Sequence, residues 1–482
     1  MVMIPNVIPS PKKYEISQKI CLIRCSIFTE EADFLPCCDL FSRLYQTLYC
    51  TVPLREPGGI HLFRDSSLAP GSYRLTSGED IKVYAADADG MFYALASLIQ
   101  LTVYDNHRIE IPELEIEDSP DKDYRSLMVD LAREWHPFPK LMKFVDICFF
   151  FKIKYLHLHF IDGLRYTLPS RAFPRLPSEN EHYTFEQIAQ LNAYAKARGV
   201  ILVPEYECPG HSMHIADTYP EVFADHAGGK PLGNRYSETG KLIAYRNIMC
   251  ASSPASLNGS KALLKEIADM FPDSPYIHIG GDEAEIRLWE ECDDCTRYMQ
   301  ENGIEDVSEL YSKFVGEIAS YVLSLGRTPI VWEGFPKKGH AHIPKETIVV
   351  AWESYYHMVY DLLEEGFRVI NASWSPLYIV PSFTTRWSPF DILKWNVHRW
   401  QHWWPKSEAY LNPITVTDTE RVLGAALCCW EQSFEQEINA IMENIAAVAE
   451  RTWNVQRRVS DEEYNELYQG QRKTLARIIQ DR

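Results

Sequence analysis

Two neighbouring carboxylates, Asp282 and Glu283, come directly after an apolar run and two glycines in the stretch SPYIHIGGDEAEIRLW. Residues 276–280 alternate in the way that is typical of a buried strand, so the two acids stand where that strand ends. A carboxyl group at such a position can transfer a proton in a reaction, and its neighbour can hold a different part of the substrate. The residues at the ends of the other predicted strands indicate what that substrate is.

Tryptophan and glutamate stand together at the ends of three further apolar runs, as Trp332-Glu333, Trp352-Glu353 and Trp430-Glu431. Other predicted strands end on His157, His159, Glu205, Glu207, Asn371 and Trp374. A tryptophan offers a flat apolar wall, and a carboxylate accepts hydrogen bonds from hydroxyl groups, which together suit a sugar ring. The chain has no glycine-rich phosphate loop, dinucleotide fingerprint or HExxH motif. These residues predict acid catalysis on a carbohydrate, with no metal and no cofactor.

Eight apolar, β-rich runs are predicted to be the strands that carry these side chains. They cover residues 126–131, 154–159, 200–205, 276–280, 328–332, 347–352, 368–372 and 424–430. Amphipathic segments separate most of them, and runs such as GVILVPE and ETIVVAW have the continuous apolar character of parallel strands buried on both faces. The pattern predicts an α/β protein with a (β/α)8 TIM barrel, in which the chemistry lies at the carboxyl ends of the strands.

Before about residue 120 the pattern of apolar and polar residues differs from that of the predicted barrel. SYRLTSG and DIKVYAA read as two antiparallel strands joined by a turn, and the segment after them has apolar residues at helical spacing. We therefore expect a small N-terminal α+β domain over residues 1–120 and the catalytic barrel over residues 121–482.

The composition of the chain limits the partners that we expect it to bind and the cellular compartment in which we expect it. The 482 residues carry a formal net charge of −19 and no basic run, so nucleic acid is not an expected partner. No apolar run reaches the ~18 residues of a membrane span, and the first residues do not resemble a secretory signal. Twelve cysteines without such a signal predict reduced thiols in a cytoplasmic protein. Cys292 and Cys295 form an isolated C-x-x-C, and no other ligands follow at zinc-finger or zinc-ribbon spacing, so we expect ordinary thiols.

Adjacent acids cannot flank a glycosidic bond in the usual way. Most glycosidases place two carboxyl groups about 5–5.5 Å apart for retention or about 6.5–9.5 Å apart for inversion, on either side of the bond. Neighbouring residues can instead lie on one side, where one protonates the leaving oxygen and the other holds another group. An N-acetyl group of the substrate could then supply the nucleophile, as in substrate-assisted glycosidases.

The motif HIGGDE, residues 278–283, resembles the signature of the family 20 glycoside hydrolases, the β-N-acetylhexosaminidases. The resemblance extends over most of the chain, in the segments DADGMFYALASLIQL, YRSLMVDLAREW, LHLHFID, VPEYECPGHS, RTPIVWEG and AERTWN. It implies an exo-acting retaining glycosidase that releases terminal β-linked N-acetylhexosamine, GlcNAc or GalNAc, from an oligosaccharide or glycoconjugate through an oxazolinium intermediate.

The resemblance also implies roles for single residues. Glu283 would be the general acid and then the general base, with a raised pKa, and Asp282 would hold the acetamido N–H and stabilise the oxazolinium. Tyr378 would donate a hydrogen bond to the acetamido carbonyl. The residues implied to bind the sugar or to set the field around the acid are Arg125, Asp162, His211, Trp332, Trp352 and Trp430. For Arg125, a buried ion pair is the alternative.

The chain departs from the family pattern where outer sugar hydroxyls would bind. Val380 and Gln432 occupy positions that usually hold acids, so Glu431 in a shifted register, or Gln432 as a neutral amide, would have to substitute. A glycosidase for a free or modified hexosamine, or a catalytically silent sugar-binding barrel, therefore stays open as an alternative. The tryptophan-rich segment 395–404 could cover the site, bind a second sugar or form a homodimer contact.

Overall fold

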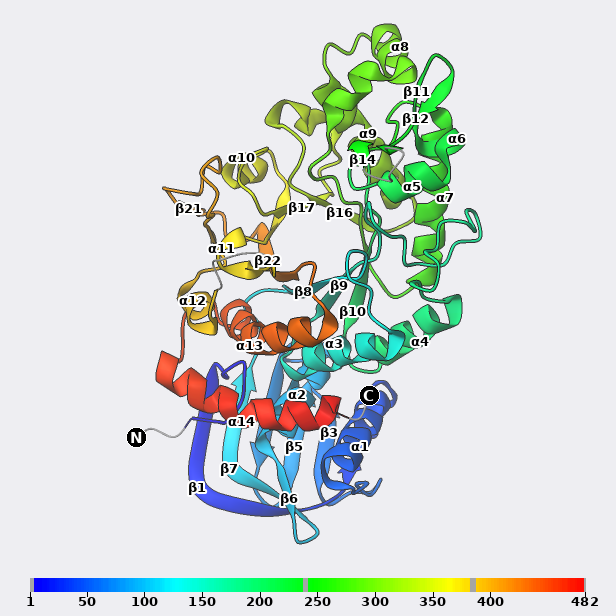
Figure 1. Ribbon diagram of the computed structural model, residues 1–482. Coiled ribbons are helices and arrows are strands. Elements are labelled where there is room, and N and C mark those ends of the chain that lie inside the picture. Colours follow the sequence, from blue (N-terminus) through cyan, green and yellow to red (C-terminus); the bar gives the residue numbers. More distant parts are fainter. Residues whose placement is uncertain (1–3, 237–241, 382–386, 481–482) are drawn as a thin grey trace.

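The protein is described by a computed structural model that covers residues 4–236, 242–381 and 387–480 (Figure 1). Among these residues the N-terminal part forms a seven-stranded sheet, in the order β1-β7-β4-β5-β3-β2 with β6 beside β7. Its strands are β1 (Lys13–Arg24), β2 (Ile27–Phe28), β3 (Ile60–Arg64), β4 (Tyr73–Ser77), β5 (Ile81–Ala85), β6 (Val103–Asp105) and β7 (Arg108–Asp118). The predicted antiparallel pair is confirmed as β4 and β5, in register from Tyr73 opposite Ala85 to Ser77 opposite Ile81.

Three helices join this sheet to the rest of the chain. They are α1 (Leu35–Tyr49), α2 (Ala88–Leu101) and, from the far end of the chain, α14 (Asp461–Ile479); a short 3-10 turn, η1 (Ala32–Phe34), precedes α1. Helix α2 begins where the Asp87 carboxylate accepts a hydrogen bond from the Gly90 N–H, 2.8 Å away, which satisfies a free donor of the first turn. Because α2 contacts β4 and β5 on one side and helix α3 on the other, its apolar surface is buried all round.

Eight parallel strands form a closed barrel, which confirms the predicted fold class. They are β8 (Tyr124–Asp130), β9 (Tyr155–His159), β10 (Ile201–Glu205), β15 (Tyr276–His278), β16 (Thr328–Trp332), β17 (Ile348–Ala351), β18 (Arg368–Asn371) and β22 (Val422–Cys429). The pairing of β18 with β22 closes the ring, and each strand lies within two residues of its predicted range. The interior is filled by side chains such as Met128, Val203, Ile330, Val350 and Ile370.

Helices surround this barrel (Figure 1). They are α3 (Phe138–Phe150), α4 (Phe185–Lys196), α7 (Pro254–Met270), α9 (Val307–Ser324), α10 (Val359–Glu364), α12 (Pro389–Lys394) and α13 (Phe434–Trp453). Among the described residues, no helix is both long and apolar enough to cross a bilayer.

Two long connections stand at the carboxyl ends of the strands and form part of the barrel mouth. After β10 come α5 (Met213–Thr218), α6 (Pro220–Phe223), β11 (Asp225–Ala227), β12 (Lys230–Leu232), β13 (Arg235–Tyr236) and β14 (Leu242–Ala244). After β15 come η2 (Ile286–Glu291) and α8 (Asp293–Asn302). The two connections touch each other, since α8 packs against β11 (Figure 1).

The remaining elements lie between β16 and β22. They are η3 (Lys337–His342), α11 (Trp374–Leu377), β19 (Tyr378–Ile379), β20 (Arg399–Trp400) and β21 (Ile414–Thr415). The short strand β19 pairs with the end of β22, which fixes Tyr378 beside Cys428 at the mouth of the barrel.

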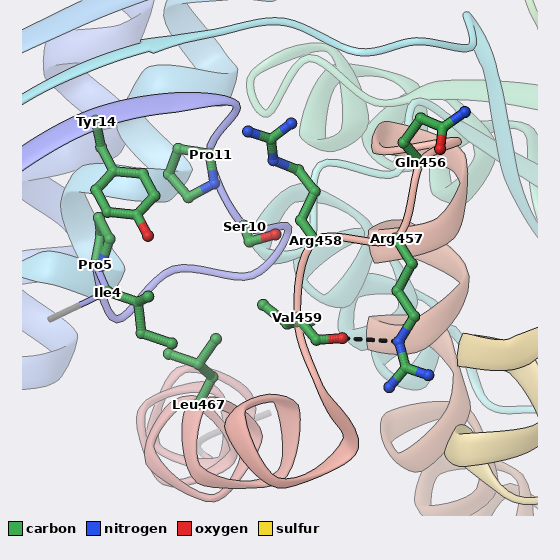
Figure 2. A pocket seen from close by; sticks show the side chains of 10 residues that line it. All are labelled: Ile4, Pro5, Ser10, Pro11, Tyr14, Gln456, Arg457, Arg458, Val459 and Leu467. Carbon is green, nitrogen blue, oxygen red and sulfur yellow. Dashed lines mark hydrogen bonds between the residues drawn. The ribbon is translucent and has the colours of Figure 1, made fainter. Parts of the chain in front are cut away.

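A cavity of about 260 Å³ lies between the first residues and the link from α13 to α14 (Figure 2). There Arg457 donates a hydrogen bond to the carbonyl of Val459, 2.7 Å away. Helix α13 runs back from the carboxyl end of β22, so this cavity is on the amino-terminal side of the barrel. The residues described as lining it include no carboxylate, so it is not a candidate for the predicted chemistry.

Candidate active site

The two adjacent acids occupy different environments at the end of β15. The Asp282 side chain is 13% exposed, whereas that of Glu283 is 53% exposed. The preceding glycines are required because Gly280 and Gly281 have φ of +66° and +96°, and a Cβ on Gly280 would lie 1.9 Å from the Glu207 carboxylate. The Gly281 N–H donates to that same carboxylate at 3.1 Å. The glycine pair therefore lets the chain pass close to Glu207 and present both acids.

His211 links the two acids to a third carboxylate. Its Nδ1 lies 3.2 Å from Asp162 Oδ2, and its Nε2 lies 3.4 Å from Glu283 and 3.9 Å from Asp282. Burial lowers the pKa of His211, but hydrogen bonds to Asp162 and Glu283 and the charge of Asp282 raise it well above its ordinary value. The neighbouring carboxylates therefore favour the protonated form of His211, and the structure brings together the four predicted residues Asp162, His211, Asp282 and Glu283.

A buried chain of charged groups continues behind Asp162. His159 lies 3.2 Å from Asp162 and 2.5 Å from Glu205. Glu205 also contacts His278 at 2.9 Å and accepts a hydrogen bond from Trp332 Nε1 at 2.7 Å. Burial opposes the charge of Glu205, but the surrounding imidazoles hold its pKa well below the ordinary value, and Glu205 and Asp162 in turn raise the pKa of His159 to about 10 against its own burial. These contacts hold the Asp162 side chain in place, and Asp162 in turn orients His211.

The acids themselves have opposite pKa shifts. Burial raises the pKa of Asp282. The hydrogen bond to His211 lowers the pKa of Glu283, although partial burial acts against it. The expectation that the surroundings raise the pKa of Glu283 is therefore wrong for the free protein, because sequence spacing does not reveal the imidazolium beside it. Glu207, a predicted strand-end residue to which the sequence assigned no role, has its pKa raised well above the ordinary value by burial and by the charge of Asp282.

Arg133 is an arginine that lies beside the predicted site residues. It follows β8 and lies 2.8 Å from Asp162 Oδ2, 3.3 Å from Asp130 Oδ2 and 3.7 Å from Glu431. Its guanidinium also lies 5.0 Å from the ring centre of Trp430, within the range of a cation–π contact. Arg133 can therefore offer donors to a bound hydroxyl group beside an aromatic face.

The prediction for Arg125 is wrong, because this residue is the second of β8 and lies at the amino-terminal side of the barrel. Its guanidinium donates to the carbonyls of Lys152 and Lys122 at 2.9 and 2.6 Å and packs on Trp453. A buried ion pair does not hold Arg125 either, because the groups that its guanidinium hydrogen-bonds are carbonyl oxygens. The rule that barrel chemistry follows the strand end points to Arg133, so a sequence signal did exist.

An aromatic wall stands beside the acids. Tyr378 stacks on Trp374 with ring centres 4.3 Å apart and on Trp352 at 6.0 Å, and it lies 6.3 Å from Trp430. Trp332 packs on Trp430 from below at 5.8 Å and is almost fully buried. The structure thus brings the predicted aromatic residues together and places Trp374, another predicted strand-end residue, against Tyr378. Burial raises the pKa of Tyr378 well above its ordinary value, so its hydroxyl keeps its proton.

The three glutamates that directly follow a tryptophan, Glu333, Glu353 and Glu431, have different surroundings. Glu333 accepts hydrogen bonds from the backbone of Ser354 and Tyr355 at 2.9 and 2.8 Å, and so shapes the loop after β17. Burial, together with the charge of Glu333, raises the pKa of Glu353 to about 8. Glu431 is half exposed beside Arg133. Only Glu431 is placed to accept a hydrogen bond at the rim.

A cavity of about 440 Å³ lies beside Arg133, Asp162, His211 and Glu431. It is lined by Arg133, Glu134, Asp162, Leu164, His211, Tyr245, Asn247 and Glu431. Tyr245 and Asn247 come from the connection after β10 and carry no pattern that sequence reasoning could single out. A neighbouring cavity of about 370 Å³ is lined by Tyr378, Val380 and Gln432 among others, and Gln432 donates to the Ile379 carbonyl at 3.3 Å. Of the two predicted substitutes for the missing acids, Glu431 thus lies with Arg133 and Gln432 does not.

The tryptophan-rich segment supports the aromatic wall. Trp395 and Trp400 are buried and donate to the carbonyls of Arg399 and Ala351 at 3.0 and 2.9 Å. Trp403 lies 5.8 Å from Trp374, which is the ring stacked on Tyr378. Packing behind the site therefore accounts for these three tryptophans.

Comparison with known proteins agrees with this geometry. The sequence model described as glycosyl hydrolase family 20, catalytic domain, matches residues 123–456, and that of glycosyl hydrolase family 20, domain 2, matches residues 4–119. The chain is 32% identical over 333 residues to a β-hexosaminidase of Akkermansia muciniphila, covering 65% of each chain. It is 28% identical over 417 residues to the β-hexosaminidase subunit beta of Entamoeba histolytica, covering 82% of this chain and 71% of that protein.

Solved structures show the same fold. The exo-β-N-acetylglucosaminidase of Vibrio harveyi, solved with N-acetylglucosamine, superposes with a TM-score of 0.84 at 20% identity, over 98% of this chain and 77% of that chain. The β-N-acetylhexosaminidase of Streptomyces coelicolor superposes with a TM-score of 0.77 at 20% identity, over 99% of this chain and 97% of that chain.

Proposed function

Because the chain belongs to glycosyl hydrolase family 20, we propose that it is an exo-acting β-N-acetylhexosaminidase. In this proposal it releases terminal β-linked N-acetylhexosamine from an oligosaccharide or glycoconjugate, with retention of configuration. The observation that carries the proposal is the pair Asp282 and Glu283, of which one side chain is 13% and the other 53% exposed, with His211 near both and an aromatic wall beside them. The β-hexosaminidases that resemble the chain support the same activity.

In the first step the acetamido carbonyl oxygen of the substrate attacks the anomeric carbon. Glu283 gives its proton to the glycosidic oxygen, the bond from that oxygen to the anomeric carbon breaks, and the aglycone leaves as an alcohol. Asp282 accepts a hydrogen bond from the acetamido N–H and stabilises the positive charge of the oxazolinium ring. Tyr378, whose hydroxyl keeps its proton, donates to the acetamido oxygen.

In the second step a water molecule loses a proton to Glu283 and attacks the anomeric carbon, which reopens the ring. Two inversions at the same carbon give net retention. The lowered pKa of Glu283 in the free protein belongs to a half-exposed side chain. A sugar that covers this side chain removes water from it, and desolvation favours the protonated acid. Substrate binding therefore prepares Glu283 for the first step.

We propose that Arg133 and Glu431 bind the outer hydroxyls of the terminal sugar. Both line the cavity of about 440 Å³, and the 3.7 Å between them allows one hydroxyl to donate to Glu431 and accept from Arg133. GlcNAc and GalNAc differ in the orientation of one such hydroxyl, so this pair would set the preference between them.

The test is hydrolysis of the nitrophenyl β-glycosides of GlcNAc, GalNAc, glucosamine and glucose by the purified protein, with Glu283→Gln as the control. Turnover confined to the two N-acetylated sugars is the expected result. Turnover of glucosamine or glucose alone would show that the acetamido group plays no part, which would overturn the substrate-assisted mechanism. Binding of a sugar without any turnover would instead mean a silent sugar-binding barrel.

We also propose that the protein works in a reducing compartment, the cytoplasm. All twelve cysteines are free thiols, and such thiols persist where glutathione and thioredoxin keep them reduced. Fractionation of the source cells tests this proposal, and recovery of the protein with an exported marker protein would overturn it.

A further inference from the structure

Outside the site, three thiols and a carboxylate meet where the two long connections touch. Cys250 follows the β13–β14 hairpin, and Asp225 begins β11. Cys292 directly precedes α8, and Cys295 lies in its first turn. All four residues are buried, and one donor atom from each lies within 4.8 Å of all the others. Sequence spacing does not reveal this group, since Asp225 and Cys250 join the C-x-x-C only through the fold.

The spacing of the sulfurs fits a metal better than a disulfide. Cys250 Sγ lies 3.8 Å from Cys292 Sγ and 3.7 Å from Cys295 Sγ. A zinc ion with sulfur ligands at about 2.3 Å in a tetrahedron places neighbouring sulfurs about 3.8 Å apart. A disulfide would need about 2.05 Å and would leave the third thiol unpaired.

Asp225 supplies the fourth position of such a tetrahedron. Its Oδ2 accepts from Arg246 at 2.7 Å, and Arg246 is held in turn by Glu291 at 2.8 Å. Its Oδ1 is buried and has no hydrogen-bond partner among the residues that the structure describes. An unpaired buried carboxylate oxygen is costly, and metal ligands are commonly oriented by an outer partner as Arg246 orients Asp225.

We propose that Asp225, Cys250, Cys292 and Cys295 bind one zinc ion. Three thiolates and a carboxylate fill the four positions of tetrahedral zinc and leave none open, so the site is structural rather than catalytic. The hydroxyl of Ser252 donates to Cys295 Sγ at 3.4 Å.

The proposed zinc ion lies where it can hold two segments of the active site together. Tyr245 and Asn247, which line the cavity over the acids, stand a few residues before Cys250, and Glu283 stands on the segment that leads to Cys292. A metal that joins these segments would hold Tyr245 and Asn247 in place on one side and the segment that carries Glu283 on the other. Zinc removal should therefore lower thermal stability and raise KM more than it lowers kcat.

Metal analysis of the protein purified without chelators tests the proposal. We expect about one zinc per chain in the wild type. Zinc should be lost in Cys295→Ser and kept in Cys37→Ser, a matched change of a buried cysteine in the N-terminal sheet region. Replacement of zinc by Co²⁺ should give the thiolate charge-transfer and strong d–d absorption of a tetrahedral site, and Asp225→Asn should shift these bands.

If Cys295→Ser does not fold, the wild type still decides the question. After reduction and removal of metal, it should take up zinc from a chelating dye, and a thiol reagent should release that zinc. A wild-type chain that holds no zinc and takes up none would overturn the proposal, as would a disulfide among the three cysteines. Equal zinc contents in Cys295→Ser and Cys37→Ser would place the metal elsewhere and have the same consequence.

Discussion

Replacement of His211 by asparagine should move the pH dependence of the reaction to higher pH. His211 Nε2 lies 3.4 Å from Glu283 and 3.9 Å from Asp282, and its Nδ1 lies 3.2 Å from Asp162. An asparagine amide can still donate a hydrogen bond to Asp162, but it has no positive charge to stabilise the two anions. The substitution therefore removes one charge with little change in size.

The distances give the size of the effect. A unit charge at 3.4 Å stabilises another by about 1.2 kcal/mol in water, and at 3.9 Å by about 4 kcal/mol where the effective dielectric constant is about 20. Glu283 is 53% exposed, so the water value applies to it and corresponds to about one pH unit. Asp282 is 13% exposed, so its shift lies between about one and three pH units. Both acids should hold their protons to higher pH in the variant.

The assay is kcat/KM of a GlcNAc substrate as a function of pH, which reports the ionisation of the free enzyme. Asp282 must be charged and Glu283 protonated, so both limbs of the bell should move to higher pH, as properties of the coupled pair. His214→Asn is the matched control, because His214 bonds to the Leu176 carbonyl and not to the acids. Limbs that stay in place, or move to lower pH, would refute the role of His211.

Three other substitutions test single assignments. Glu283→Gln should reduce hydrolysis about 10²–10⁴-fold for alkyl glycosides and much less for nitrophenyl glycosides, and equal losses on both would contradict the role of general acid. Asp282→Asn should weaken binding of a thiazoline mimic of the oxazolinium about 10–100-fold, as loss of a charge-assisted hydrogen bond implies, and unchanged binding in a titration would remove that role. Arg133→Lys should raise KM about tenfold or more, whereas Arg125→Lys should lower the melting temperature with kinetics close to wild type; the reverse result would restore Arg125 to the site.

The barrel could be predicted because its signal is local and repeated. A parallel strand that is buried on both faces needs a continuous apolar run, so ETIVVAW alone identifies β17. The rule that the chemistry follows the strand ends then placed Asp282, Glu283 and Trp352 correctly. Arg125 shows what happens when a residue is assigned by resemblance and its place on the strand is not checked, since the arginine that contacts Asp162 follows β8, beyond Asp130.

Other features depend on contacts between distant parts of the chain, which a single sequence does not display. The pKa of Glu283 is set by His211, which comes from a different strand end. Cys250 and Cys292 stand 42 residues apart, and only the packing of α8 against β11 brings the fourth donor, Asp225, to them. Spacing rules for metal sites assume ligands on one short motif, and so they miss a site assembled from two connections.

Two adjacent acids can do different work because the backbone turns between them. In an extended strand, neighbouring side chains point to opposite faces and would not reach a common partner. Here Gly280 and Gly281 end the strand, and Glu283 itself has a φ of +43°, a strained value for a residue with a side chain. The turn leaves Asp282 13% exposed and Glu283 53% exposed, while their carboxylates still lie 3.9 and 3.4 Å from His211. Burial raises the pKa of Asp282 in the free protein, and the hydrogen bond to His211 lowers the pKa of Glu283. In the proposed mechanism, a sugar that covers Glu283 and offers an N–H to Asp282 would act against both shifts, because desolvation favours the protonated form of Glu283 and the hydrogen bond favours the charged form of Asp282.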